Sequence, residues 1–289
     1  MSPLWPSIKK MRLTQNMRAR LDPWFSDFLL RIVDGVEETI EDNFIRIPDD
    51  MIIPYTEENE AKEKLIEVIF PSLELQGMSS EYMISRAILS TKNEHVDELN
   101  NMLINRFPRE ENIYHSFDSA EDDTSNNFPD EFINSLNPSG LPPHRLRLKV
   151  GCPIILLRNV DPPNGLCNGT RLICRNFQAN VIDAEIAVGE HGGKRVFLPR
   201  IPLCPSDDAM YPFKLKRKQF PVRLSFAMTI NKAQGQTIPN VGVYLPQSVF
   251  SHGQLYVALS RGISRMNTKV LVNPIKVFNQ PGEGFHAKD

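Results

Sequence analysis

The texture of the sequence changes twice along the chain, and this change restricts the folds that it can adopt. Up to residue 138 and again after residue 218, short apolar runs alternate with segments whose apolar residues recur at helical spacing. Between them, short strand-like runs follow one another, separated by turn dipeptides such as Asn164-Gly165 and Asn168-Gly169. The sequence therefore predicts an α/β lobe interrupted by a small all-β insert, most simply a β-barrel.

Segment by segment, the apolar spacing predicts helices over residues 24–33, 57–70, from 93 to 107 and 254–261. It predicts strands over 82–90, 146–150, 153–157, 170–177, 181–188, 196–198, 224–230, 241–245 and 269–272. Residues 110–131 hold eight acidic residues and no Lys or Arg, which is typical of a long polar surface loop.

Composition narrows the class of protein. The chain has 289 residues, of which 41% are hydrophobic and 24% charged, so it is long enough for about two domains with a proper core. No leader-like segment or 18-residue apolar run occurs, and we expect an intracellular protein. The cysteines, Cys152, Cys167, Cys174 and Cys204, form no C-x-x-C pair; we expect small buried strand residues rather than a zinc site or disulfides.

The net charge of −2 hides a strong asymmetry between the two halves of the chain. Residues 1–140 carry 13 basic and 27 acidic side chains, whereas residues 141–289 carry 20 and 8. A polyanionic partner, if there is one, is therefore expected against the C-terminal half.

Two segments carry the strongest chemical signal. In FAMTINKAQGQT (226–237), an apolar strand ends in Thr229, Asn231 and Lys232, and parallel sheets place their ligand-binding loops at such strand ends. In HGQLYVALSRG (252–262), Arg261 closes a helix-like stretch where a phosphate could reach it. For one isolated basic residue, an ordinary surface charge is the competing interpretation.

These two segments resemble helicase motifs V and VI of the PIF-type (petite integration frequency) DNA helicases and of the related Helitron transposon helicases. Three further blocks match the family in order. Residues 2–5 with 13–18 resemble the stretch around motif IV, residues 87–93 the first strand of the second RecA-like lobe, and residues 141–151 with 165–172 the inserted Src-homology-type barrel.

The resemblance implies a superfamily-one motor with two RecA-like lobes, ATP and Mg²⁺ between them, and a DNA strand across their tops along which it steps 5′ to 3′. It divides the chain into residues 1–50, a remnant of the first lobe with motif IV; 51–130, the second lobe; 131–219, the inserted barrel; and 220–289, the rest of the second lobe with motifs V and VI.

The family's site residues carry over by position. Arg18 and Arg261 are implied as catalytic arginine fingers, which a lysine would replace poorly. Gly235, Gln236 and Gln254 are implied as nucleotide-binding residues. Gln254 and Tyr256 are also implied in support of motif VI, although a core role is at least as well supported for Tyr256. DNA contacts are implied for Thr229, Asn231, Lys232, Arg145, Arg147, Lys149 and Arg158. The 214–218 cluster is either a further phosphate-binding patch or a solvated face.

Two parts of an ATPase site do not occur in the sequence. There is no G-x-x-x-x-G-K-[ST] loop and no apolar strand ending in Asp-Glu; residues 188–195 come nearest but lack the leading glycine and the hydroxyl. We therefore expect no metal ligands in this chain, and we expect that it begins inside the first lobe and hydrolyses no ATP alone.

Three hypotheses follow. The first is the C-terminal portion of a DNA helicase of repair, recombination and telomere maintenance, nuclear or also mitochondrial, whose partners are single-stranded and forked DNA, no membrane, and a chain that supplies the missing motifs. The second is a non-catalytic single-stranded-DNA-binding remnant, derived from a transposon or completing a site in trans. The third is a fragment with no stable product.

Overall fold

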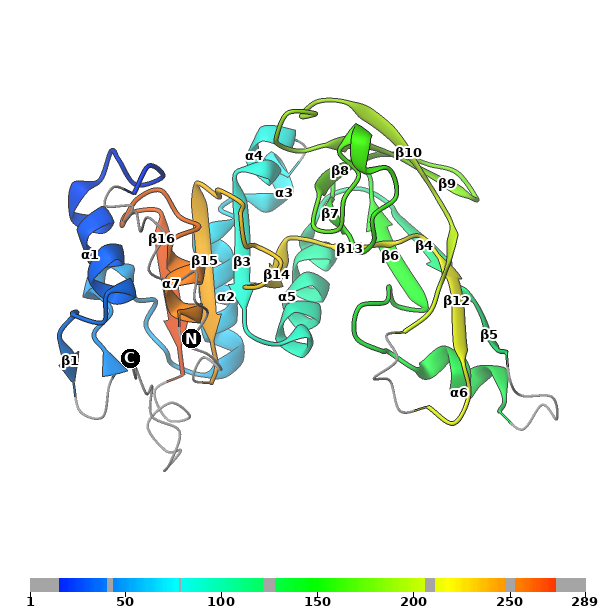
Figure 1. Cartoon of the computed structure of the whole chain (residues 1–289), viewed down its shortest axis with the longest axis horizontal. Coiled ribbons are helices and arrows are strands. Elements are labelled where there is room, and N and C mark those ends of the chain that lie inside the picture. Colours follow the sequence, from blue (N-terminus) through cyan, green and yellow to red (C-terminus); the bar gives the residue numbers. More distant parts are fainter. Residues whose placement is uncertain are drawn as a thin grey trace, which may run out of the picture.

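A computed structural model describes residues 16–40, 44–77, 79–121, 128–205, 211–247 and 253–273. It shows an α/β lobe on one side and a group of antiparallel sheets on the other (Figure 1). Residues 1–15 and 252, which contribute to the motif IV and motif VI patterns, lie outside the described part.

The lobe is built around a parallel sheet in the order β14-β3-β15-β16. Its elements are α1 (Pro23–Val33), β1 (Thr39–Ile40), β2 (Phe44–Ile45), the 3₁₀ turn η2 (Asp49–Met51), α2 (Glu58–Ile69), α3 (Leu73–Gln76), α4 (Ser80–Ile84), β3 (Arg86–Ser90), α5 (Asn93–Arg106), β14 (Ala227–Thr229), β15 (Asn240–Leu245), α7 (Gln254–Leu259) and β16 (Thr268–Val272).

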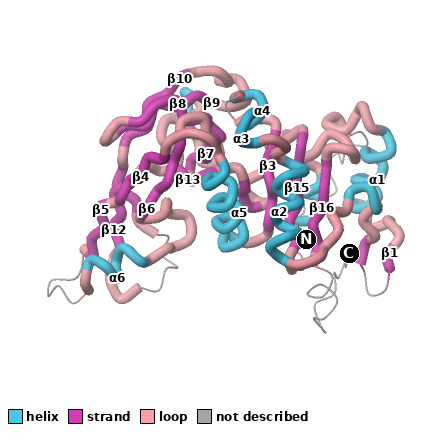
Figure 2. Tube along the Cα trace, turned by 180° about the vertical axis from the view of Figure 1, so that it is seen from behind, coloured by secondary structure: helices cyan, strands magenta, loops and turns pink. Residues whose placement is uncertain are grey.

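Helices cover both faces of this sheet, because its strands are apolar on both sides (Figure 2). Ile88 and Tyr244 pack with the buried faces of α2 and α5, whereas Leu89 and Val243 pack with α1 and α7. On β15, Gly242 lets α2 approach closely: a Cβ there would lie 2.8 Å from Ile69. The predicted α/β lobe is confirmed.

The insert consists of antiparallel sheets ordered β10-β9-β8-β7-β13, β11-β12-β5 and β4-β6. Its elements are β4 (Glu111–His115), β5 (Phe117–Ala120), α6 (Asp130–Ser135), β6 (Arg145–Lys149), β7 (Pro153–Leu156), the 3₁₀ turn η3 (Pro162–Asn164), β8 (Arg171–Phe177), β9 (Val181–Ile186), β10 (Arg195–Pro199), β11 (Ile201–Leu203), β12 (Leu215–Gln219) and β13 (Val222–Leu224).

Lobe and insert share one hydrophobic core, which runs from α2 and α5 through Phe107 and Phe226 into β7, β8 and β9. Arg171, at the start of β8, adds a polar joint. Its guanidinium is 4% exposed and donates to the carbonyls of Met83, Ile84, Arg86 and Ser225, all on the lobe side or at its border. Burial lowers the pKa of Arg171 to about 10, which still leaves it charged at neutral pH.

Several local predictions were wrong. The strand expected over residues 82–90 begins only at Arg86, because the Ser79 hydroxyl accepts from the backbone N–H of Tyr82 and caps the short helix α4. The polar loop expected over residues 110–131 contains β4 and β5, which pair with β6 and β12. Cys152 and Cys174 are buried as expected, but Cys167 is only partly buried, Cys204 is exposed, and of the four only Cys174 lies on a strand.

Strands β4 and β5 precede residue 131, where the barrel was predicted to begin, yet they pair with β6 and β12, which follow that residue. The division of the chain into four segments therefore stays a prediction.

Candidate functional site

The segment between β14 and β15 connects opposite ends of the parallel sheet. Thr229, the last residue of β14, pairs with Ser90 at the end of β3, and Asn240, the first residue of β15, pairs with Arg86 at its beginning. Residues 230–239 cross this distance in a series of turns, with Gly235 at a φ of 85° that favours glycine. The segment thus runs from the carboxyl end of the sheet to its amino-terminal end.

Arg18 and Arg261 meet at the amino-terminal end of this sheet. The Arg18 Nε donates to the hydroxyl of Thr237 over 3.0 Å, and the backbone N–H of Ile238 donates to the Arg261 carbonyl over 2.9 Å. The two arginines, 243 positions apart in the sequence, are therefore held by neighbouring residues of one segment. The Arg18 charge also contributes to lowering the pKa of Arg261.

Arg261 is held rigidly. It is 5% exposed, and its Nε, Nη1 and Nη2 donate to the Val257 carbonyl (2.8 Å), the Gln236 carbonyl (3.2 Å) and the Ser260 hydroxyl (2.8 Å). Burial lowers the pKa of Arg261, with Arg18 as the second cause. Within the described residues neither guanidinium forms an ion pair with a carboxylate, so the two positive charges face each other uncompensated.

Local sequence explains why the N-terminal segment docks here. Asp22 caps α1 by accepting from the backbone N–H of Phe25 over 3.0 Å, and its other oxygen accepts from the N–H of Arg265 over 2.8 Å. One carboxylate therefore joins the start of α1 to the loop after α7. Gln254, the first residue of α7, is 8% exposed, and Tyr256 is half-buried near Arg261.

A groove of about 760 Å³ opens at the carboxyl end of β14. Its lining includes Thr229, Asn231 and Lys232, the basic residues Lys92 and Arg223, and the acidic residues Glu94 and Asp97. Arg223 is paired with Asp97, whose Oδ1 lies 3.2 Å from its Nη1. The structure thus brings the three predicted DNA-binding residues of this segment together, and adds two basic residues that the sequence analysis missed. Lys92 precedes helix α5 and Arg223 lies in strand β13. Neither position carries a sequence motif that distinguishes it from an ordinary surface charge.

Lys232 keeps its charge uncompensated. Its Nζ donates to the Asn168 side-chain carbonyl over 2.6 Å, and burial lowers the pKa of Lys232, with the charge of Arg158 as the second cause. Arg158 itself donates to the carbonyls of Gly140 and Leu157, and no ion pair to either cation occurs among the described residues. Two neighbouring cations without a carboxylate form a place where an anion is stabilised.

The remaining predicted DNA-binding residues are placed differently. Arg145 is exposed and lines a smaller groove with Arg147 and Arg223, next to the first. Arg147 is paired with Glu111, whose carboxylate lies 2.6 Å from its Nη2. Lys149 is 9% exposed and donates to the Phe107 carbonyl over 2.8 Å, so a phosphate would have to displace that bond. Their DNA contacts stay predictions.

The basic 214–218 cluster is not uniform: Lys214 and Lys218 are exposed, which fits a solvated face, whereas two other members are paired with carboxylates. Arg217 is fully buried and forms a bidentate ion pair with Asp118, which is buried too; Lys216 pairs with Glu121. Asp118 and Glu121 come from the acidic stretch that the sequence analysis assigned to a surface loop. The charge asymmetry between the two halves of the chain is thus partly cancelled inside the insert.

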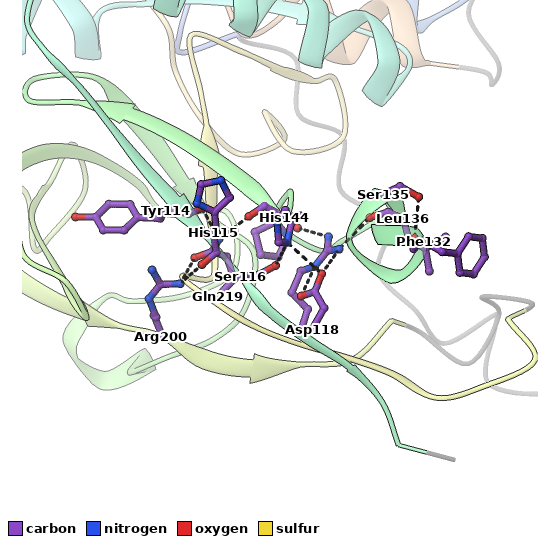
Figure 3. A network of polar contacts seen from close by, with 12 residues as sticks. Tyr114, His115, Ser116, Asp118, Phe132, Ser135, Leu136, His144, Arg200 and Gln219 are labelled. Carbon is purple, nitrogen blue, oxygen red and sulfur yellow. Dashed lines mark hydrogen bonds and ion pairs between the residues drawn. The ribbon is translucent and has the colours of Figure 1, made fainter. Parts of the chain in front are cut away.

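Figure 3 shows the side chains around this pair. The His144 Nδ1 lies 2.8 Å from the Ser116 hydroxyl and 3.5 Å from Asp118 Oδ2, so both partners approach the same ring nitrogen. A nucleophile relay of the Ser-His-Asp kind needs them on opposite nitrogens. The network is therefore a structural one that ties β5, β6, β12 and α6 together.

Within the described residues there is no group of three or more His, Cys, Asp or Glu side chains that could hold a metal ion. The arginine pair can stabilise phosphate oxygens, and nothing near it in the described part of the chain supplies carboxylates for Mg²⁺. In the same part of the chain, every helix is too short or too polar to cross a lipid bilayer.

The described residues combine a parallel sheet covered by helices on both faces, an all-β insert and two neighbouring arginines. This is the fold of known DNA helicases. The family model "DNA helicase Pif1, 2B domain" matches residues 131–177, inside the insert. The ATP-dependent DNA helicase PIF1 of Danio rerio is 36% identical over 137 residues, which cover 44% of this chain and 19% of that protein.

Two solved structures share the fold. The Pif1 helicase of Candida albicans matches with a TM-score of 0.59 and 23% identity, covering 96% of this chain and 60% of that one. Bacteroides Pif1 bound to ssDNA matches with a TM-score of 0.58 and 20% identity, covering 93% and 54%. The chain is thus a relative of the PIF-type DNA helicases and resembles their C-terminal portion; it spans about a fifth of the Danio rerio protein.

Proposed function

We propose that the chain is the strand-gripping and arginine-supplying portion of an ATP-dependent DNA helicase that moves 5′ to 3′. One observation carries this proposal: Arg18 and Arg261 come from opposite ends of the sequence, yet both are held by residues 236–238 of the segment that also carries Lys232. Two fixed guanidinium groups beside each other suit the oxygens of a transferring phosphoryl group.

The described residues suggest how each part acts. Arg261 is fixed by three hydrogen bonds, so it loses little entropy when it binds a phosphate, and its buried position strengthens the interaction. Arg18 is half-buried and more accessible to an incoming nucleotide. Lys232, Asn231 and Thr229 contact the phosphodiester backbone without reading bases. Gly235, Gln236 and Gln254 are proposed to bind the nucleotide.

ATP and Mg²⁺ are proposed as the cofactors, and the residues that hold Mg²⁺ and cradle the phosphates are proposed to come from a second polypeptide or segment. The purified chain is therefore expected to show no DNA-stimulated ATP hydrolysis. Turnover by the chain alone that Arg261→Ala abolishes would refute this part of the proposal.

The arginine roles are tested by adding a first lobe that carries the missing loop from a PIF-type helicase. We expect ATP turnover in the mixture, reduced about a thousandfold by Arg18→Ala or Arg261→Ala. The exposed neighbour Arg20 is the matched control, and Arg20→Ala is expected to leave turnover unchanged. Equal losses in all three variants would contradict the assignment.

The second hypothesis, a non-catalytic single-stranded-DNA-binding module, is favoured by the groove, whose lining brings Thr229, Asn231 and Lys232 together. Both hypotheses predict salt-sensitive binding to oligo(dT). With Arg145, Arg158 and Lys232 on three phosphates, log Kd should change with log salt by a slope of about 2, and Lys232→Ala should remove about 0.7 of it. Lys64→Ala on α2 is the control. If the arginine variants leave reconstituted turnover intact, the second hypothesis stands.

The biological setting is proposed from the family resemblance. We propose action on single-stranded and forked DNA in repair, recombination and telomere maintenance, in the nucleus and also in mitochondria, and the kinship with Helitron helicases belongs to the same proposal. Comparing the affinity for forked and blunt duplexes tests the substrate, and imaging a fluorescent fusion tests the location.

A further inference from the structure

The turn at residues 165–170, which leads into β8, contacts residues 230–239 of the lobe. This turn is stiff because its polar groups are bonded internally and to β7. The Thr170 hydroxyl donates to the Gly165 carbonyl over 2.8 Å and accepts from the Cys167 N–H over 3.1 Å. The Gly169 N–H donates to the carbonyl of Leu156 in β7 over 2.9 Å. Its position is therefore fixed by the insert.

The turn holds the 230–239 segment at two points. The Asn168 side-chain carbonyl accepts from Lys232 Nζ over 2.6 Å, and the Gly169 backbone carbonyl accepts from Gln236 Nε2 over 3.3 Å. Between turn and segment lies a groove of about 510 Å³. Gly169 has a φ of 93°, so its carbonyl direction depends on a backbone conformation that other residues rarely adopt.

Gln236 connects this contact to Arg261. Its Nε2 also donates to the Lys232 carbonyl over 3.1 Å, and its own backbone carbonyl accepts from Arg261 Nη1 over 3.2 Å. An unbroken series of hydrogen bonds therefore runs from Asn168 through Lys232 and Gln236 to Arg261. Since Asn168 offers an amide oxygen and no charge, it orients the Lys232 ammonium without neutralising it.

We propose that the turn 165–170 is a positioning element: Asn168 and Gly169 set the placement of Lys232 and, through Gln236, of Arg261. The proposal rests on the function proposed above, because it concerns the groups that grip DNA and reach the nucleotide. It means that a shift of the insert on DNA binding changes the geometry of Arg261, and that the arginine responds to the insert as well as to the strand.

The test reads the Arg261 Nε–Hε signal of the purified chain by nuclear magnetic resonance, assigned by its loss in Arg261→Lys. The signal is well suited because Arg261 Nε donates to a backbone carbonyl and is buried. Without any ligand, Asn168→Ala and Gln236→Ala are expected to shift it and to speed its hydrogen exchange several-fold. Asn164→Ala, in the same loop but bonded to Asp161 and Lys194, is the control and should leave it unchanged.

A conservative variant separates positioning from charge. Asn168→Asp keeps the acceptor for Lys232 and adds a negative charge, so the Arg261 signal should stay as in the wild type while oligo(dT) binds about three- to tenfold more weakly. Asn168→Ala should move both. Circular dichroism melts verify that each variant is folded.

The outcomes distinguish the two proposals. If Asn168→Ala leaves the ligand-free Arg261 signal unchanged, or if Asn164→Ala changes it equally, the positioning role is overturned even when DNA binds normally. If the signal responds as expected but the wild type fails to bind oligo(dT), the positioning role is supported and the proposed DNA grip is overturned.

Discussion

The ion pair between Asp118 and Arg217 allows a quantitative test of how the insert is held together. Both side chains are fully buried, and Arg217 Nε and Nη2 reach the carboxylate over 3.0 and 2.7 Å. Removing one partner leaves the other charge buried without a counter-charge. We therefore expect Asp118→Ala to lower the free energy of unfolding by about 3–5 kcal/mol.

The double variant Asp118→Leu/Arg217→Met separates the pair from the rest of the network. It removes both charges, but the carbonyls of Pro142 and Leu136 lose their donor, because Arg217 binds them over 3.0 Å each. Those two losses cost about 2–3 kcal/mol together. The double variant should therefore be no less stable than Asp118→Ala alone, although it changes twice as many residues.

The measurement is urea unfolding followed by circular dichroism, with free energies from linear extrapolation. Lys216→Ala is the matched control on the same strand, since Lys216 and Glu121 are 43% and 45% exposed and should contribute at most about 1 kcal/mol. The reasoning is refuted if Asp118→Ala costs as little as this control, or if the double variant loses the sum of both single losses.

Three further predictions concern other parts of the fold. In Gly262→Ala the new Cβ would lie 2.1 Å from the Thr268 hydroxyl oxygen, so we expect a loss of about 1–3 kcal/mol in a thermal melt, partly restored by Thr268→Ala. Asn100→Ala removes two bonds to the Ala227 backbone and should cost about 2–4 kcal/mol in urea unfolding; an effect below 1 kcal/mol would contradict this. Burial lowers the pKa of His144 below its ordinary 6.5, so the unfolded chain binds the proton more tightly and stability falls as pH drops below about 6.5. Urea midpoints at pH 7.5 and 5.5 should differ less in His144→Gln.

The elements whose partners are near in sequence or whose pattern is apolar could be predicted. The parallel strands, α2, α5 and most strands of the insert follow from spacing alone, because burial on one or both faces leaves a periodic pattern. β4 and β5 could not be predicted this way. Both strands are largely polar. They form because they pair with β6 and β12, whose basic residues lie far along the chain.

The candidate site shows the same division. Arg261 and Lys232 were singled out because their motifs are local, and Arg18 because its block resembles the family's; their roles stay predictions. The count of basic residues could not show that Lys149 and Arg217 are buried and bonded, since charge alone does not separate such side chains from solvated ones. The turn that contains Asn168 was predicted from the sequence. Its contact with Lys232 was not, because that contact depends on tertiary packing.

The joint at Arg171 gives the insert a property that its proposed DNA contacts lack. A DNA grip made of cations and phosphates weakens steeply as ions screen it, whereas Arg171 is buried and donates to four neutral carbonyls. High ionic strength should therefore strip nucleic acid from the groove while insert and lobe stay joined. The proposed release of DNA at high ionic strength therefore leaves the joint between insert and lobe intact.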